Sequence, residues 1–268
     1  VQGLFRNPLA DPGIIGTTSG AVLGGKVVLV LVEVILGAAA IRGIAPDLLI
    51  PIGCMLGAGI SLALLFALTR NGSSVLLLLL IGFALSSLFA SLGGMLTTIA
   101  QDSWELGRAL VAFALGSVAG ASMRHVLFAL PLVVAGVIAA MRFSTSLDLL
   151  LSGEEEAESL GLDVAHVRRW TAVWVAVLTG AAVSLGGFVG FVGLVVPHAL
   201  RPYAGVEHRK LVPYAAVFGA IFVAASDVFA RSLPGMSEMP LGVVTGLVGA
   251  PIFLRLLLRA HRTGGLDG

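Results

Sequence analysis

The stretch GAVLGGKV at residues 20–27 is the first place where this sequence could perform chemistry, because it matches the G-x-x-x-x-G-K pattern of phosphate-binding loops. Such a loop holds phosphates on backbone N–H groups, and a Ser or Thr directly after its lysine binds Mg²⁺. Val27 occupies that position here, and the flanking residues are apolar over the length of a membrane span. We therefore interpret the match as coincidental and expect no nucleotide site in this chain.

The histidines show no pattern of a metal centre, since none has a second His or Cys at ligand spacing. They are His125, His166, His198, His208 and His261. His198 stands apart because it follows Pro197 in an apolar stretch, where an ionisable side chain is a functional candidate by default. A hydrogen bond to a neighbouring carbonyl is its alternative role. The sequence predicts no metal site and no catalytic residues.

Lys26, Glu33 and Asp227 are further ionisable residues within apolar stretches. On a helix, Lys26 and Glu33 share a face about 10 Å apart along the axis. A proton relay gathers several such groups in the membrane interior. With so few available, we favour side chains that face a cavity or pair at an interface. Asp227 stands four residues before Arg231, a spacing that lets the two pair on one helix face.

The elements that position these residues are membrane helices. The chain is 57% hydrophobic and only 12% charged, with a mean hydropathy of +1.03, which is too apolar for a water-soluble globule. The net charge of +1 gives no basic footprint for nucleic acid, and the single Cys54 can form no intrachain disulfide. No signal-peptide pattern opens the chain. Because the sequence at Val1 already lies in the middle of the membrane-protein pattern, we expect residues upstream of it.

A helix needs about 20 apolar residues to cross ~30 Å of hydrocarbon, and the apolar runs here are continuous, unlike the alternating strands of a barrel. We therefore predict an all-α, polytopic membrane helix bundle. The expected spans are 13–41, 48–69, 74–99, 126–143, 170–191, 192–204, 211–230 and 241–258. Glycines four residues apart predict faces on which helices pack closely. These pairs are Gly16/Gly20, Gly53/Gly57, Gly116/Gly120, Gly186/Gly190 and Gly242/Gly246.

Lys and Arg predict the orientation, because they accumulate on the cytoplasmic side. If the spans alternate with 142–169 inside, the cytoplasmic set is Arg6, Arg70, Arg142, Arg168, Arg169, Arg201, Arg209, Lys210, Arg255, Arg259 and Arg262. The smaller outer set is Arg42, Arg108, Arg124 and Arg231. We expect the C-terminus and the acidic loop within 142–169 to lie in the cytoplasm.

That acidic loop, SGEEEAESLGL at residues 152–162, predicts a short helix. Ser152 or Gly153 can cap it, and its first glutamates meet the positive end of the helix dipole. Gly161 can end it after about two turns. A solvated cap would explain the acids equally well. A docking surface for a soluble partner better explains why a rigid knob stands here.

Five stretches make the sequence resemble the FecCD-type permeases of ATP-binding-cassette (ABC) importers, which transport ferric siderophores, heme or cobalamin. They are LFRNPLADPGIIGTTSGA (4–21), LLLSGEEEAESLGLD (149–163), GGFVGFVGLVVPHALR (186–201), HRKLVPYAAVFGA (208–220) and SDVFARSLPGMSEMPLGVVTGLVGAPIFLRLLL (226–258). Their order across nearly the whole chain makes the combination specific.

The resemblance implies one permease domain over 1–268 with a ten-helix fold lacking its first one to two helices, placed among lipid in a bacterial inner membrane. It implies a homodimer, an ATPase under each permease that binds ATP and Mg²⁺ in the partner chain, and a periplasmic or extracellular binding protein. This chain itself would bind no cofactor. Its ATPase-coupling segment, about 149–165, would act through Glu154, Glu155, Glu156, Ala157, Leu160 and Gly161. Arg231 would receive acidic residues of the binding protein.

Gly186, Gly187, Gly190 and Gly193 are the expected hinges, with Pro197 and His198 along the pathway, because glycine relieves backbone strain and admits close packing. No cluster of His, Tyr or Met identifies the cargo, so we rank an iron chelate (siderophore or heme) above cobalamin. Two other classes stay open. An ion-gradient-driven transporter would depend on Glu33 or Asp227, whereas a membrane enzyme would need a convergent catalytic group.

Overall fold

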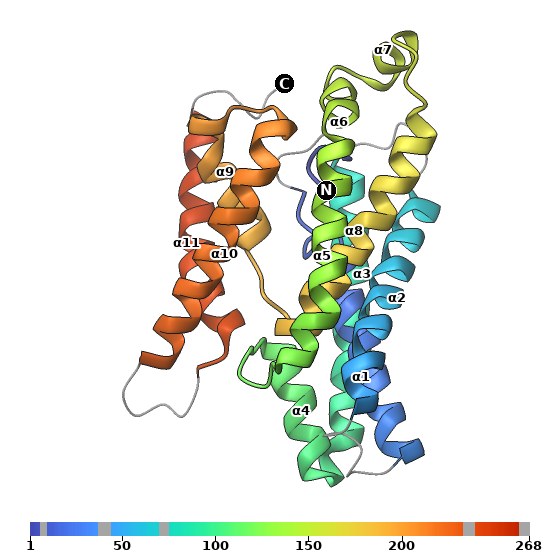
Figure 1. The fold of residues 1–268 in the computed structure, drawn as a ribbon, viewed down its shortest axis with the longest axis vertical. Coiled ribbons are helices and arrows are strands. Elements are labelled where there is room, and N and C mark those ends of the chain that lie inside the picture. Colours follow the sequence, from blue (N-terminus) through green and yellow to red (C-terminus); the bar gives the residue numbers. More distant parts are fainter. Residues whose placement is uncertain (6–9, 37–43, 70–74, 233–238, 263–268) are drawn as a thin grey trace.

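The computed structural model describes residues 1–5, 10–36, 44–69, 75–232 and 239–262 (Figure 1). Over these residues the chain is helical, without strands, as predicted. The helices are α1 (Thr17–Leu36), α2 (Ile44–Leu68), α3 (Val75–Ile99), α4 (Trp104–Leu115), α5 (Met123–Arg142), α6 (Ser144–Leu151), α7 (Glu154–Ser159), α8 (Val164–Gly186), α9 (Val192–Ala204), α10 (His208–Ser232) and α11 (Leu241–Arg262). A short 3-10 helix, η2 (Ala100–Asp102), precedes α4. Arg6, Arg42 and Arg70 lie outside the described residues.

Within the described ranges, six helices are long and apolar enough to cross a membrane: α1, α2, α3, α5, α8 and α10. Each matches one of the predicted spans. The two other predicted spans, 192–204 and 241–258, fold as α9 and α11. Helix α9 has only 13 residues, too few to cross the hydrocarbon alone.

Helices α4 and α6 were not predicted, because a search for runs of about 20 apolar residues does not detect shorter helices. Helix α4 has 12 residues and includes the charged Glu105 and Arg108. Its start is nonetheless marked, since the Ser103 side chain accepts a hydrogen bond from the N–H of Leu106 at 3.5 Å. Helix α6 continues from α5 after a single turn residue, Phe143.

Glycine contacts hold α1 against α2. A Cβ added to Gly24 would lie 2.0 Å from the carbonyl oxygen of Gly53, and one added to Gly57 would lie 2.1 Å from that of Gly20. The two backbones therefore touch, as small residues one turn apart allow, and this predicted packing is confirmed.

Two other predicted glycine pairs, Gly116/Gly120 and Gly186/Gly190, do not form helix faces. Gly116 and Gly120 lie in the connection after α4, and Gly190 lies between α8 and α9. Gly242 does pack closely, but against the carbonyl oxygens of Leu115 and Phe188. Spacing alone could not separate helical glycines from those that end helices.

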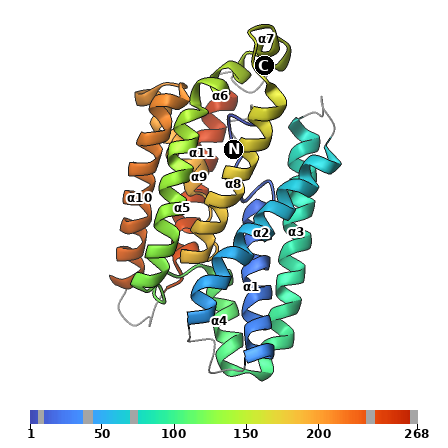
Figure 2. The ribbon, with the colours of Figure 1, turned by 45° about the vertical axis from the view of Figure 1, so that its right-hand side comes forward.

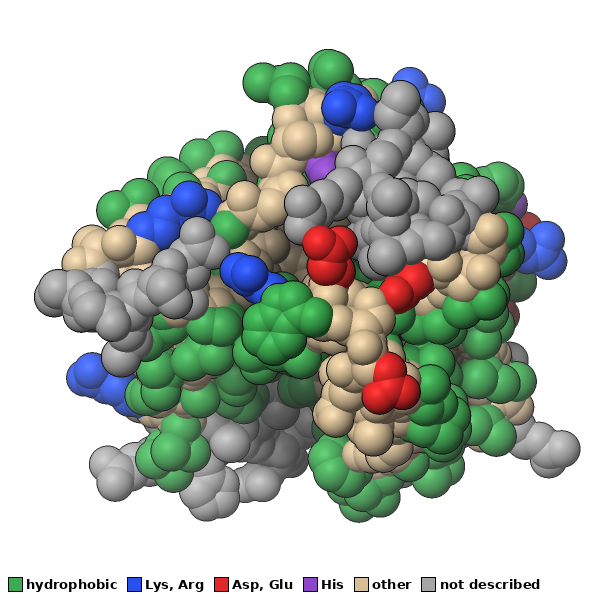
Figure 3. All heavy atoms as spheres, turned by 90° about the horizontal axis from the view of Figure 1, so that it is seen from below, with side chains coloured by type: hydrophobic (Ala, Val, Ile, Leu, Met, Phe, Trp, Pro, Cys, Tyr) green, Lys and Arg blue, Asp and Glu red, His purple; other side chains and the backbone are tan. Residues whose placement is uncertain are grey.

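Helices α9, α10 and α11 form one group beside α5, while α1, α2, α3 and α8 pack on its other side (Figures 1 and 2). Helices α6 and α7 project at one end of the bundle, the α7 end, and α4 lies at the opposite α4 end (Figure 1). The α4 end shows acidic and basic side chains among apolar ones (Figure 3). Its exposed charged residues include Asp102, Glu105, Arg108, Arg124 and Arg231.

Candidate functional site

Helix α7 is bounded by two glycines in backbone conformations that other residues rarely adopt. Gly153 is its N-cap with φ 131°, and Gly161 follows it with φ 85°. The N–H of Gly161 donates to the carbonyl of Glu158 at 2.9 Å, and that of Leu162 donates to Ala157 at 3.0 Å. This pair of bonds is a Schellman motif. The predicted ends of the helix are confirmed, with Gly153 as the cap, while Ser152 ends α6.

A small apolar base fixes α7 to the bundle. Ala157 is fully buried, in a cluster with Leu147 and Leu150 of α6 and Val164 and Val167 of α8. Because the only buried residue of α7 is an alanine, the helix lies close against its two neighbours. The cluster makes α6, α7 and the start of α8 one packed unit.

Polar contacts strengthen that unit at both ends of α7. The Arg168 guanidinium of α8 donates to the Glu154 carboxylate at 2.5 Å, with both side chains partly buried. The Asp163 carboxylate caps α8 by accepting from the N–H of His166 at 2.9 Å. Glu154 therefore helps to hold the helix in place.

The predicted coupling residues divide into two groups. Glu154 and Ala157 face the bundle, whereas the rest lie at the surface. The surface group consists of Glu155, Glu156, Leu160 and Gly161. Leu160 is 68% exposed at the tip of α7. Acidic side chains beside an exposed leucine on a rigid helix form a surface suited to a protein partner with basic and apolar groups.

Asp148 links this unit to α10, a contact that the sequence analysis missed. Its Oδ1 accepts from the backbone N–H of His208 at 3.0 Å and lies 2.5 Å from Nδ1 of the same residue. His208 is the first residue of α10, so the carboxylate also meets the positive end of that helix. The two residues are 60 positions apart, and nothing in the sequence pairs them.

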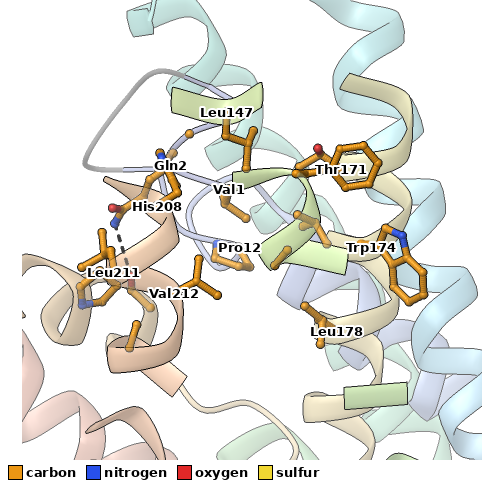
Figure 4. A pocket seen from close by; sticks show the side chains of 18 residues that line it. Val1, Gln2, Pro12, Leu147, Thr171, Trp174, Leu178, His208, Leu211 and Val212 are labelled. Carbon is orange, nitrogen blue, oxygen red and sulfur yellow. Dashed lines mark hydrogen bonds between the residues drawn. The ribbon is translucent and has the colours of Figure 1, made fainter. Parts of the chain in front are cut away.

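A cavity of about 280 Å³ lies where α5, α6, α8, α9, α10 and the N-terminal segment meet. Figure 4 shows Leu147, Thr171, Trp174, Leu211 and Val212 around it. The lining is mostly apolar. Its lining includes residues of both α8 and α10.

The predicted hinge glycines lie in and around the connection from α8 to α9: Gly187 and Gly190 lie within it, Gly186 ends α8 and Gly193 lies in the first turn of α9. Gly187 has φ 64° and caps α8, and Phe191 has φ 66° and precedes α9. A Cβ at Gly187 would lie 2.4 Å from the carbonyl oxygen of Phe113, so both conformation and space require glycine there. A Cβ at Gly193 would meet the Asp11 carboxylate, whereas Gly190 is loosely surrounded.

Pro197 and His198 both lie within α9. Pro197 lines the cavity of Figure 4, and the half-buried His198 stands one turn before Arg201. Arg201 donates to the side chain of Gln2 at 2.7 Å. This hydrogen bond connects α9 to the N-terminal segment. Among the described residues, His198 belongs to no group of side chains that could hold a metal ion.

Arg231 lies in the last turn of α10, at the α4 end. Its Nε donates to the Asp227 carboxylate at 2.9 Å, which confirms the predicted pair. The Arg231 side chain is 51% exposed, so it is accessible to a partner. Helix α10 has 25 residues, which is about 37 Å at 1.5 Å per residue. Its first residue, His208, contacts Asp148, and Arg231 lies in its last turn at the opposite end.

Lys26 lies in the middle of helix α1 and not in a loop, which excludes the phosphate-binding interpretation. Its ammonium donates to the carbonyl of Gly93 at 3.0 Å and to the hydroxyl of Thr97 at 2.8 Å, both on α3. One carboxylate oxygen of Glu33 is buried without a hydrogen-bond partner among the described residues. The structure thus places Lys26 at a helix interface.

The described residues form a bundle in which six helices are long and apolar enough to cross a membrane, which is typical of a polytopic membrane protein. The profile of the FecCD transport family matches residues 1–259, and the chain belongs to this family. It is therefore a multi-pass membrane permease of the ABC-importer type, and the resemblance seen in the sequence is confirmed.

Characterised relatives cover nearly the whole chain. It is 38% identical to the cobalamin import system permease BtuC of Halobacterium salinarum over 96% of this chain and 66% of the relative. It is 39% identical to the hemin transport system permease HmuU of Yersinia pestis over 97% and 75%. It is 34% identical to the Fe(3+) dicitrate transport system permease FecD of Escherichia coli over 97% and 77%. The chain thus spans between 66% and 77% of the length of these proteins.

Among solved structures, the chain is similar to an ABC transporter of the metal-chelate type in an inward-facing conformation. The TM-score is 0.80 at 32% identity, covering 96% of this chain and 79% of the other.

Proposed function

We propose that α7 couples this permease to an ATPase subunit in an importer that takes up an iron chelate. The observation that supports it is the division of α7 into a buried base at Ala157 and an exposed surface at Glu155, Glu156 and Leu160. A helix held on one side and bare on the other can transmit a push from a docked protein. The chain itself binds no nucleotide in this scheme; ATP and Mg²⁺ belong to the partner.

The two ends of the bundle would meet different partners. The α7 end would face the cytoplasm, with the ATPase, and the α4 end would face outward, where Arg231 meets acidic residues of a substrate-binding protein. The basic residues support this orientation, because Arg168, Arg169 and Arg201 belong to the larger cytoplasmic set. Two copies would form the pathway between them, each above one ATPase.

Movement at α7 would reach the outer end through α6 and α10. The Asp148–His208 contact joins α6 to the start of α10, and α10 ends at Arg231. The cavity beside α6 leaves room for α10 to shift, and Gly187 lets the α8–α9 connection bend. Coupling of this kind requires that nucleotide and binding protein each prefer one state of the permease.

The cargo is proposed as an iron chelate, either a siderophore or heme, ahead of cobalamin. Relatives that transport hemin and Fe(3+) dicitrate support the first, and a relative that transports cobalamin supports the second. Uptake driven by an ion gradient is the alternative class, and it would depend on Glu33 or Asp227.

The test of coupling is co-purification of the full-length permease with its ATPase, comparing wild type with Glu156→Lys. We expect the wild type to retain the ATPase and the variant to lose most of it, because the charge at the docking surface reverses. Glu207→Lys is the matched control, since Glu207 is also exposed but pairs with Lys210 outside α7. Equal retention of the ATPase by all three would contradict the assignment of α7.

A further inference from the structure

A second cavity, of about 430 Å³, lies between α1, α3 and α4. Its walls combine apolar residues with a small polar set. The polar residues are Ser19 and Lys26 of α1 and Ser86 and Ser87 of α3. Phe188, from the hinge-containing connection between α8 and α9, closes one side. The cavity therefore touches the segment that is proposed to bend during transport.

Lys26 stands near the middle of α1, nine residues from its first residue and ten from its last, or about 14 Å from each end. Its side chain is buried. A charge at this depth is costly, and it makes Lys26 a candidate for a substrate or ion pathway. Among the described residues that line the cavity there is no carboxylate to balance it.

The ammonium is oriented by α3 but not saturated. The Gly93 carbonyl and the Thr97 hydroxyl accept two of its N–H groups, and an ammonium has three. A Cβ on Gly93 would lie 3.6 Å from Nζ, an ordinary van der Waals distance, so the lysine packs closely along this part of α3. A neutral Asn or Gln side chain could also form hydrogen bonds between two helices. The bonds from Lys26 to α3 therefore do not by themselves explain why a charged residue stands here.

The cavity is bordered by an exposed, polar part of α3. Ser87 and Ala90 line the cavity and are exposed, and Ser91, Gly94 and Thr98 continue the same exposed face. Polar surface at membrane depth faces protein or water and avoids lipid. The cavity would therefore open toward a water-filled space or a second copy of the chain.

We propose that Lys26, with the hydroxyls of Ser19 and Ser87, forms an anion-binding point along the pathway, and that the cargo is a chelate bearing carboxylates. This inference rests on the proposed importer function and narrows its cargo. An ammonium and hydroxyl groups that line one cavity can together bind carboxylate oxygens. A cavity of this size holds an acidic arm of a chelate, with the remainder in the pathway between two copies.

The experiment measures ATP-driven uptake in proteoliposomes that contain the full-length permease, its ATPase and its binding protein. The probes are hemin, Fe(3+) dicitrate, a neutral ferric trihydroxamate and cyanocobalamin. The variants are Lys26→Met, which removes the charge, and Lys26→Arg, which keeps it. Lys210→Met is the matched control, because Lys210 is the only other lysine and lies exposed at the α7 end. Ser87→Asp is a further variant, which adds a neutralising charge and leaves the contacts of Lys26 with α3 in place.

We expect the wild type to transport a carboxylate-bearing probe. Lys26→Met and Ser87→Asp should raise its KM about tenfold or more. Lys26→Arg and Lys210→Met should stay within about threefold of wild type. If Lys26→Met does not assemble, Ser87→Asp decides the question.

Three results would overturn the inference: transport of carboxylate-free probes alone, an unchanged KM in the charge variants, or equal losses for acidic and neutral cargo. The last is what a purely structural tie between α1 and α3 predicts. If no probe is transported although ATP is hydrolysed, the proposed importer function fails instead.

Discussion

Replacing Asp148 by Ala should disconnect the coupling segment from α10. Asp148 accepts from the backbone N–H of His208 at 3.0 Å and contacts its Nδ1 at 2.5 Å, and its side chain is 29% exposed. Hydrogen bonds to a charged group contribute about 1.5–3 kcal/mol each, and a carboxylate at a helix start adds about 0.3–1 kcal/mol. Because such contributions overlap, we expect a loss of about 2–3 kcal/mol, or roughly 30- to 150-fold in the population with α6 attached to α10.

The assay has two readouts on the full-length permease assembled with its ATPase. Hydrogen exchange of the first turn of α10 measures whether the attachment is lost, and ATP hydrolysis with and without binding protein measures the coupling. Asp148→Ala should speed exchange at the start of α10 and abolish the response to binding protein. The ATPase should still associate, because Glu156 and Leu160 are unchanged.

Two further variants separate the possible causes. Asp148→Asn keeps an acceptor for the His208 N–H but removes the charge, so its effect should be intermediate. Glu207→Gln removes a neighbouring exposed charge that pairs with Lys210, and it should behave as wild type. Faster exchange at α10 combined with a full response to binding protein would refute the proposed route.

Three other substitutions test separate parts of the structure. Gly161→Pro should unfold the end of α7 and uncouple transport, because proline cannot adopt φ 85° and lacks the N–H that donates to Glu158; Gly161→Asn should be tolerated, and normal transport by the proline variant would count against α7. Gly24→Val should destabilise the bundle by about 1–3 kcal/mol or more in thermal unfolding, because even a Cβ meets the Gly53 oxygen at 2.0 Å; unchanged stability would mean that α1 and α2 are not in contact. Arg231→Glu should weaken binding of the binding protein in a pull-down, with the permease–ATPase complex intact, whereas unchanged binding would remove Arg231 from the docking surface.

The sequence predicted the long helices and the ends of α7 well, for physical reasons. Continuous apolar runs give spans directly, and a glycine such as Gly161 can occupy a conformation that other residues avoid. The family could be recognised because its motifs occur in order across the chain. These signals depend on residues that are close together in the sequence, so they can be recognised without a three-dimensional structure.

Features that depend on distant residues could not be predicted. The Asp148–His208 contact and the bonds from Lys26 to α3 join helices that no local pattern pairs. Lys26 and Glu33 do lie on one helix, as expected, yet the partners of Lys26 come from α3. Spacing also could not distinguish Glu154, which pairs with Arg168, from the exposed Glu155 and Glu156.

The most direct test of the account is uptake of an iron chelate by the full-length permease reconstituted with its ATPase and binding protein. We predict uptake that requires ATP and binding protein, continues when proton and sodium gradients are collapsed, and is unaffected by Glu33→Gln. Uptake that proceeds without ATP on an ion gradient, and stops in Glu33→Gln, would contradict the account.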